Sequence, residues 1–540
     1  MGGVVQMRRL VAIATGLALV LSVGWAGQVR ARPDFPEGAA AKRSVDAAGF
    51  DKQHGPHSQI ECTVAAGGAA NVRLDCDDPF PNNEPDIEVD PDDPLHMIAS
   101  SNDFGTCCDE FYTTFDGGRT WITGNMSKED VQKIGSDPVT VFDRKHGVAI
   151  HASLSFSVQH AAGTQACDGD VVVSISRNGG TVWELPVVVD DGQGCDLSAT
   201  QLFNDKEWIV TDNSTASPFY GRTYLTWSKF EFHFGAYASS AIWAAHSDDG
   251  GDHWSTPQKI SGFNPALCTF QVSGPAGECD EDQFSVPTVQ PNGTVFVAFQ
   301  NEQNVALWEP GEQFDDQYLV VSSTDGGATW SAPRFVVGAE DGSRDYPINV
   351  SGRQTLSGYQ LRVNSAGNIV ASPIDGSLFF VFSDNRNGTH DSDSPVTKTD
   401  VFLVTSKDGV TWSGPTRVDA SPSDQWFPWA DVNPVTGRVG VAYNDRSVGD
   451  PTLYGFALAQ QSRNGSFAKT TVSTAASHPT ESRFFRARTP GCENCATFHG
   501  DYVAIAYGSD GRANLVWTDM RDPDPLVAGL FDQFVYYARK

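Results

Sequence analysis

The sequence predicts an all-β protein, and three observations support this prediction. After residue 58, short runs rich in Val, Ile, Phe and Tyr alternate with Gly, Asp, Asn and Pro, and hardly any stretch has the periodicity of an amphipathic helix. A motif with two glycines and a tryptophan recurs along the chain. A second pattern, in which a β-run ends in Asp or Asn before an Arg, recurs out of phase with it. Regular repetition of this kind is typical of an architecture built from similar sheets.

The composition limits the classes of partner. The 540 residues are 40% hydrophobic and 11% aromatic, which is enough for a large buried core. The formal net charge of -30 argues against a surface that follows phosphates or anionic lipids, because such surfaces need clustered Lys and Arg. We therefore expect no nucleic-acid partner, and no membrane association after removal of a signal peptide.

The N-terminus predicts export. Residues 1–26 resemble a signal peptide, in which Arg8 and Arg9 precede an apolar run and small residues near Ala26 suit cleavage. An uncleaved anchor is the alternative, since the run is barely long enough to span a bilayer. Residues 27–57 are polar and rich in Ala, Gly and Pro, and are expected to form a flexible leader. The mature protein is expected to be a secreted monomer.

The cysteines point to an oxidising compartment. Ten Cys is an even number, and in an exported chain it suggests disulfides. The motif "CENC" could also be half of a zinc site, but a second half is missing. Sequence alone does not establish pairing, although the spacing favours local loops and leaves Cys107 and Cys108 as a vicinal pair or as partners of something else. The local pairs are Cys62 with Cys76, Cys167 with Cys195, Cys268 with Cys279, and Cys492 with Cys495.

The repeated motif has the pattern S-x-D-G-G-x-T-W. Its turn-forming residues suggest a structural role. Asp325 can accept hydrogen bonds from its own turn, Gly326 and Gly327 allow positive φ, and Trp330 can wedge between sheets. A catalytic carboxylate or calcium ligand is the alternative, but one pocket does not need six copies. The copies are "TFDGGRTW" at 114–121, "SRNGGTVW" at 176–183, "SDDGGDHW" at 247–254, "STDGGATW" at 323–330, the shorter "SKDGVTW" at 406–412, and a worn "SRNGSF" at 462–467.

The β-runs between the motifs predict the architecture. Seven strand pairs are found, and the first six are each followed by a motif copy. The chain ends on "FDQFVYYARK", so we expect an N-terminal strand within 61–74 to complete the last sheet. Sheets joined in this way around an axis make a β-propeller. We predict seven blades within residues 58–540, or six if one pair belongs to an insertion.

The motif is the Asp box, and from about residue 80 the chain resembles the bacterial secreted sialidase-like proteins with Asp-box (BNR) repeats. This resemblance implies that each box is a turn between the third and fourth strands of a blade. The opposite face would then carry the polar ligand pocket, lined by the ends of the second strands, where the pattern of Asp or Asn before Arg lies, and by the starts of the first strands. Residues expected there are Glu84, Asp86, Asp137, Asp205, Glu207, Arg362, Trp426, Asp501 and Tyr502.

The resemblance also implies a chemistry. Sialidases of this fold hold the sugar carboxylate with three Arg, attack with a Tyr activated by a Glu, and use an Asp as acid and base. The Arg cluster would be Arg386, Arg446 and Arg521, with Trp426 as a further substrate contact. The nucleophile would be Tyr502 or Tyr359, its base Glu207 or Glu302, and the acid Asp137 or Asp86. The Arg-Ile-Pro motif of those enzymes is missing before the first box.

Structural alternatives exist for several of these residues. Arg386 and Arg521 could instead pair with Asp384 and Asp519 as ion pairs that hold loops. Asp205 and Glu207 would suit a calcium ion. The chemistry otherwise requires no cofactor.

Three functions are therefore carried forward. The first is a sialidase-type glycoside hydrolase acting on extracellular glycans or glycoproteins. The second is a non-catalytic propeller that binds a glycan or a protein. The third is an endo-acting glycosidase with two opposed carboxylates, such as Asp137 and Asp501, whose separation would predict retention or inversion.

Overall fold

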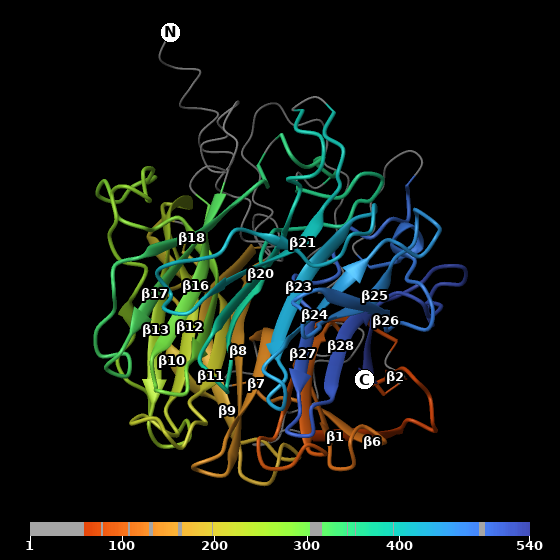
Figure 1. Cartoon of the computed structure of the whole chain (residues 1–540), viewed down its shortest axis with the longest axis horizontal. Helices are drawn as coiled ribbons and strands as arrows, with labels where there is room; N and C mark the ends of the chain where they lie inside the picture. The colour runs from red at the N-terminus through yellow and green to blue at the C-terminus, as the bar shows by residue number, and fades with distance from the viewer. Residues whose placement is uncertain are drawn as a thin grey trace.

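The computed structural model describes residues 59–540 (Figure 1), apart from 77–78, 106–108, 129–132, 160–164, 197, 303–315, 343, 351–352, 392–393 and 485–491. The predicted signal peptide and leader, and the two adjacent cysteines at 107 and 108, lie outside the described residues. In the described part of the chain, no helix combines the length and the apolar character needed to cross a membrane.

The fold is all-β, as predicted, and the described strands form six hydrogen-bonded sheets. The first contains β3 (Asn82–Val89), β4 (Met97–Asp103), β5 (Asp109–Thr114), β6 (Thr120–Asn125) and, beyond β6, β1 (Gln59–Ala65). The second joins β7 (Ile134–Asp143), β8 (Val148–Gln159), β9 (Gln165–Ser176) and β10 (Val187–Asp190) to β11 (Thr200–Thr211), β12 (Thr223–His233), β13 (Ala236–Ser247) and β14 (Gln258–Lys259).

The other four sheets have four strands each. They are β15 (Asp282–Val289), β16 (Val295–Asn301), β17 (Asp316–Ser323) and β18 (Arg334–Ala339); β19 (Asn368–Ala371), β20 (Leu378–Asp384), β21 (Asp400–Ser406) and β22 (Thr416–Arg417); β23 (Gln425–Val432), β24 (Val439–Asp445), β25 (Gly455–Gln461) and β26 (Phe467–Thr471); and β27 (Ala504–Tyr507), β28 (Ala513–Asp519), β29 (Phe534–Arg539) and β2 (Val72–Arg73).

The large second sheet consists of two antiparallel sets of four strands. One parallel bridge, between Phe203 of β11 and Gly169 of β9, joins them. Within each set, consecutive strands pair in antiparallel orientation. Short turns between strands favour this orientation. The first strands of successive sets contact one another in the order β3, β7, β11, β15, β19, β23 and β27, and β27 contacts β3 again.

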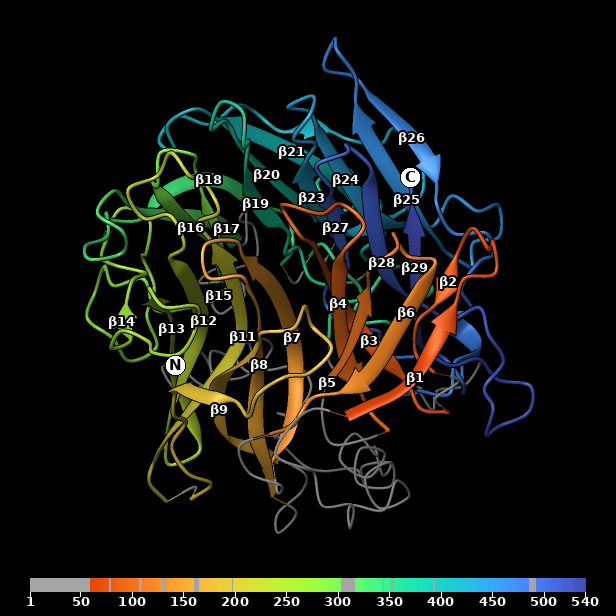
Figure 2. The same ribbon diagram turned by 90° about the horizontal axis from the view of Figure 1, so that it is seen from below.

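The first and last sheets lie side by side (Figure 2), where the colour passes once around the molecule from orange to dark blue. The N-terminal strand β2 belongs to the last sheet, since Val72 lies opposite Tyr537 of β29 and Arg73 opposite Tyr536. Just after β2, Leu74 is fully buried, and its main-chain N–H donates to the carbonyl of Val535 at 2.9 Å. An early segment of the chain thus packs as part of its final sheet.

Replacing Leu74 with Ala is expected to lower the free energy of unfolding by about 2–5 kcal/mol, because it removes a fully buried side chain from the core. Chemical denaturation measures the loss. The matched control is Leu95→Ala, where the side chain is 40% exposed, and this change should cost much less. Equal, small effects of the two variants would show that the N-terminal segment is not integral to the last sheet.

The motif copies are turns between the third and fourth strands of their sets, as the resemblance implied. In the copy between β17 and β18, Asp325 accepts a hydrogen bond from the main-chain N–H of Thr329 at 2.9 Å and another from its hydroxyl at 2.6 Å. Gly326 and Gly327 have φ values of 72° and 86°. These contacts confirm the structural role predicted for the copy.

The four predicted local disulfides are all present. They join Cys62 to Cys76, Cys167 to Cys195, Cys268 to Cys279, and Cys492 to Cys495. The interpretation of "CENC" as part of a zinc site is therefore wrong, because both of its thiols are in a disulfide.

Candidate functional site

Five of the first strands share an unusual backbone feature. Each contains a β-bulge, and the residue at the bulge has a positive φ although it is not glycine. Such a conformation costs about 1–3 kcal/mol and is found most often at functional sites. The residues are Glu84 (54°), Asp137 (58°), Lys206 (52°), Phe284 (55°) and Phe427 (51°).

A sixth position resembles these five. Gly500 precedes β27 and has a φ of 92°, and it is followed by Asp501 and Tyr502. In β3, β7 and β23 the bulge residue precedes a proline, as in "EPD", "DPV" and "FPW". Proline inside a strand marks a bulge or an edge, so this signal in the sequence could have revealed the repeat.

The bulges bring several charged side chains together. We call Glu84, Asp137, Asp205, Lys206, Glu207, Arg362, Asp501 and Tyr502 the central cluster. Electrostatic interactions connect its members across β3, β7, β11 and the segments that precede β19 and β27. Seven of the eight were predicted from the sequence, and Lys206 was missed.

Glu84 is buried and joins three segments. One of its carboxylate oxygens accepts the main-chain N–H of Asp501 at 2.9 Å, and the other accepts the side-chain amide of Asn102 at 2.7 Å. The carbonyl of the same Asn102 side chain accepts the main-chain N–H of Asp137 at 2.8 Å. Asn102 therefore sets the positions of Glu84 and Asp137 relative to each other.

The side chain of Asn102 therefore holds Glu84 and Asp137 as a neighbouring pair of carboxyl groups. Burial raises the pKa of Glu84 well above its usual range, and repulsion from Asp137 and Asp501 adds to this. Burial also raises the pKa of Asp137, although Lys206 opposes the shift. Two neighbouring buried carboxyls cannot both be ionised at little cost, so this pair retains a proton where an exposed carboxyl would have lost it.

Lys206 is the cation among these carboxyls. Its Nζ lies 4.1 Å from the centre of the Trp208 ring and 3.8 Å from that of Tyr502, which is the geometry of a cation–π interaction. Among the described residues, the Nζ has no hydrogen-bond partner. Burial lowers the pKa of Lys206, and the carboxylates of Asp137 and Glu84 oppose this shift.

Asp501 is held as an ion pair. The Arg362 Nη2 forms a salt bridge with one of its oxygens, and the Nε lies 3.2 Å from the other. The side-chain amide of Asn364 donates to Asp501 at 3.0 Å. Arg362 lies before β19 and not at its start, because that strand begins only at Asn368. The guanidinium, which contacts both oxygens, and the amide donor together fix the orientation of this carboxylate.

Glu207 and Tyr502 do not form the predicted nucleophile and base. Both are buried, and neither the Glu207 oxygens nor the Tyr502 hydroxyl has a hydrogen-bond partner within the described part of the chain. Burial raises the pKa of both groups well above their usual ranges. Glu207 and Tyr502 are not hydrogen-bonded to each other, so the structure does not support this part of the sialidase chemistry.

Asp86 lies two residues after the first bulge and is also buried. It accepts the main-chain N–H of Thr140 at 2.9 Å, which couples β3 to β7. Burial raises the pKa of Asp86 to about 6, and hydrogen bonds from Thr140 and Ile87 limit the shift. The folded state therefore binds a proton between about pH 4 and pH 6 that the unfolded chain has already released.

The free energy of unfolding is expected to fall as the pH rises from 4 to 6, and Asp86→Asn should remove part of this fall. The shift from 3.8 to about 6 corresponds to about 3 kcal/mol. Urea denaturation at a series of pH values gives both curves. If the wild type and the variant have parallel curves, Asp86 does not titrate with a raised pKa.

The three predicted substrate-binding arginines are not brought together. Arg386 forms a salt bridge with Asp384 at 2.6 Å, and Arg521 one with Asp519 at 2.5 Å. These are the ion pairs named as the structural alternative. Arg446 binds Asp424 at 2.9 Å and donates to the carbonyls of Ser357 and Pro451 at 2.7 Å each. Each guanidinium has its own carboxylate in its own part of the fold, which does not support a shared carboxylate-binding site.

Trp426 and Tyr359 belong to the hydrophobic core. Trp426 is 0% exposed and donates its indole N–H to the Nε2 of His499 at 3.2 Å. Tyr359 is buried below the guanidinium of Arg446, which lies 4.1 Å from its ring centre. A residue with no exposed surface cannot contact a ligand from solvent, so the predicted substrate contact of Trp426 is wrong.

Glu302, the other predicted base, lies close to the central cluster. Burial raises its pKa to about 7, and Arg353 opposes the shift while Asp501 adds to it. By solvent accessibility the residue is only half-buried, so the size of this shift is an upper bound.

No family model and no curated protein matches this chain. Solved structures with some similarity include the NanB sialidase from Streptococcus pneumoniae, with 9% identity over 92% of this chain and 96% of that chain and a TM-score of 0.42. The intramolecular trans-sialidase from Ruminococcus gnavus has 12% identity over 76% and 95%, and a TM-score of 0.42. A polysaccharide lyase of family PL25, an ulvan lyase, has 10% identity over 86% and 95%, and a TM-score of 0.45. TM-scores below 0.5 do not define the activity of this chain.

Two groups among the described residues have the donor spacing of a metal site, and neither contains Asp205 or Glu207. In the first group, formed by three aspartates, the ammonium of Lys133 already contacts Asp170 and lies 3.4 Å from Asp168. The second group consists of Glu340, Asp345 and His390. Calcium binding by Asp205 and Glu207 stays a prediction.

Proposed function

We propose that the protein is a secreted glycoside hydrolase that acts on extracellular glycans, built as a seven-bladed β-propeller over residues 58–540. The seven antiparallel sets of strands would be the blades, and β2 would close the last one. The four disulfides support an oxidising compartment. The observation that carries the activity is the Glu84–Asp137 pair, which Asn102 bridges, next to the ion-paired Asp501.

The two kinds of carboxyl suit the two roles in glycoside hydrolysis. One carboxyl must give a proton to the leaving oxygen, and the other must act on the anomeric carbon directly or through water. The Glu84–Asp137 pair retains a proton, with the larger rise in pKa at Glu84, and we assign Asp137, the less buried of the two, as the group that passes this proton to the leaving oxygen. Asp501 is held by its ion pair with Arg362 and its hydrogen bond from Asn364, and it is the second carboxylate. This corresponds to the glycosidase with opposed carboxylates considered in the sequence analysis.

The charge of the cluster favours a neutral sugar over a sialoside. It contains five carboxyl groups, those of Glu84, Asp137, Asp205, Glu207 and Asp501, and its cations are Lys206 and Arg362. Arg362 is already bonded to Asp501. A sugar carboxylate binds best where guanidinium groups are free to form bidentate contacts, and the three predicted arginines are engaged elsewhere.

Burial of the cluster favours a second candidate, a non-catalytic propeller that binds a glycan or a protein. Glu84, Asp137, Lys206 and Tyr502 are all buried. In that case the charged network would hold the first strands together, and recognition would use other residues.

Release of a fluorescent aglycone from a panel of neutral glycosides and a sialoside tests the proposal. We expect hydrolysis of at least one neutral glycoside, and no loss of that activity in Arg446→Ala. Selective hydrolysis of the sialoside that Arg446→Ala abolishes would favour the sialidase-type function instead. A panel without any hydrolysis, together with retained binding on a glycan array, would favour the binding protein.

A further inference from the structure

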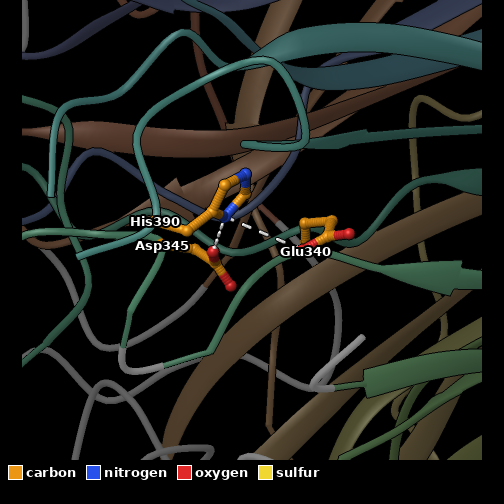
Figure 3. A group of neighbouring side chains, drawn as sticks. All are labelled: Glu340, Asp345 and His390. Atoms are coloured by element: carbon orange, nitrogen blue, oxygen red, sulfur yellow. Dashed lines mark hydrogen bonds and ion pairs between the residues drawn. The ribbon is translucent and has the colours of Figure 1, made fainter. Parts of the chain in front are cut away.

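A mixed group of one imidazole and two carboxylates, shown in Figure 3, contains no member of the central cluster. Glu340 directly follows β18, and Asp345 lies in the same segment between β18 and β19. His390 comes from the loop between β20 and β21. The group therefore joins two segments that are 45 residues apart in the sequence.

The donor atoms converge. The His390 Nδ1 contacts one Asp345 oxygen and lies 3.7 Å from an oxygen of Glu340 (Figure 3). One ligand atom from each of the three side chains lies within 4.8 Å of the other two. This spacing fits three donors around a single ion, because zinc–nitrogen and zinc–oxygen distances are each about 2.0–2.2 Å.

Glu340 has no other evident role. The residue is 6% exposed, and its carboxylate accepts no hydrogen bond from the described residues. A buried carboxyl without a hydrogen-bond donor is costly, and a bound cation would remove this cost.

Asp345 is oriented by its surroundings. Its second carboxylate oxygen accepts the main-chain N–H of Gly342 at 2.9 Å, and its main-chain carbonyl accepts the side-chain amide of Asn385. One carboxylate oxygen thus remains directed toward His390. Secondary contacts of this kind are typical of metal ligands.

We propose that Glu340, Asp345 and His390 bind a divalent transition-metal ion, with Zn²⁺ as the best match. Imidazole and carboxylate donors together suit Zn²⁺, whereas Ca²⁺ and Mg²⁺ prefer oxygen donors alone. Three protein ligands leave one tetrahedral position for water. The ion would also fasten the segment between β18 and β19, which carries Arg362 toward the central cluster.

The test is metal binding by the full mature chain after treatment with a chelator. Titration calorimetry with Zn²⁺, and elemental analysis after dialysis, should each give one ion per chain. His390→Ala and Glu340→Gln should weaken Zn²⁺ binding at least about tenfold. His390 is partly exposed, so its replacement is expected to leave the fold intact, which circular dichroism checks.

The matched control is His253→Ala, which removes a more exposed histidine that pairs with Asp249 at 2.7 Å in a motif turn. This variant should bind Zn²⁺ as the wild type does. The proposal fails if the wild type binds no stoichiometric Zn²⁺, or if binding survives both substitutions in the triad. Because binding is measured without a glycan, failure of the proposed hydrolase activity would not affect the result.

Discussion

Asp137→Asn is expected to lower the hydrolysis of a glycoside with a poor leaving group by about a hundredfold to ten-thousandfold, which is the usual contribution of a general acid. Asparagine keeps the shape of the side chain but has no acidic proton. Burial raises the pKa of both Glu84 and Asp137, so the wild-type pair keeps a proton to supply at a pH at which an exposed carboxyl has already lost its own. Steady-state kinetics on methylumbelliferyl and alkyl glycosides measures the loss.

A dinitrophenyl glycoside separates acid catalysis from general damage. Its leaving group departs without protonation, so Asp137→Asn should retain most of its activity on this substrate. Asp325→Asn is the matched control, because Asp325 lies in a motif turn and bonds within that turn. Equal losses on both classes of substrate would show that Asp137 is not the proton donor.

The pH profile gives an independent readout of the same pair. The rate should fall as the pH rises through the raised pKa of the Glu84–Asp137 pair, because the donor then loses its proton. An exposed carboxyl would lose its proton at a lower pH, close to 4. Glu84→Gln should shift this limb of the profile, since it removes the partner that shares the proton.

Lys206→Met is expected to cost about 3–5 kcal/mol of folding stability, the usual result of removing one partner from a buried ionic group. Methionine retains apolar contact with Trp208 and Tyr502 but leaves the neighbouring carboxyls without their ammonium group. The loss of stability should be larger at pH 8 than at pH 5. Without the ammonium group the pKa values of the buried carboxyls rise further in the folded state, so keeping the variant folded at a higher pH costs more free energy. Chemical denaturation at both pH values measures it.

Lys407→Met is the matched control, with a side chain that is 75% exposed in its ion pair with Asp375. Exposed ion pairs contribute about 0–1 kcal/mol, so this variant should be close to the wild type at both pH values. A small and pH-independent effect of Lys206→Met would mean that the ammonium does not compensate the charge of the cluster.

Local patterns predicted much of the fold correctly. The Asp, Gly and Trp residues of the motif specify a turn through bonds within a few residues, as Asp325 and Thr329 show. The spacing of the cysteines favoured the four disulfides that the structure shows, because each pair closes a short loop, with separations of 3 to 28 residues. The positions of the strands could likewise be predicted, because strand formation depends largely on the types of neighbouring residues along the chain.

The candidate site was predicted only in part. Asp137, Glu207, Asp501 and Tyr502 do share one cluster, because the starts of the first strands meet. Lys206 was missed between two predicted residues, since nothing in "NDKEW" shows that the backbone reverses its side-chain direction at a bulge. The three arginines do follow the ends of second strands, as predicted. Their contacts, however, are made with the nearest carboxylate, as Arg386 makes with Asp384.

The sequence by itself determined the all-β class and the motif turns and favoured the local disulfides, because each depends on residues that are close along the chain. Only the tertiary structure decided which charged groups meet. Glu84 and Asp501 are 417 residues apart, and their contact requires the last sheet to lie beside the first. A shift of one residue in a strand turns every side chain to the other face, so the bulges in β3, β7 and β11 decide which side chains enter the central cluster.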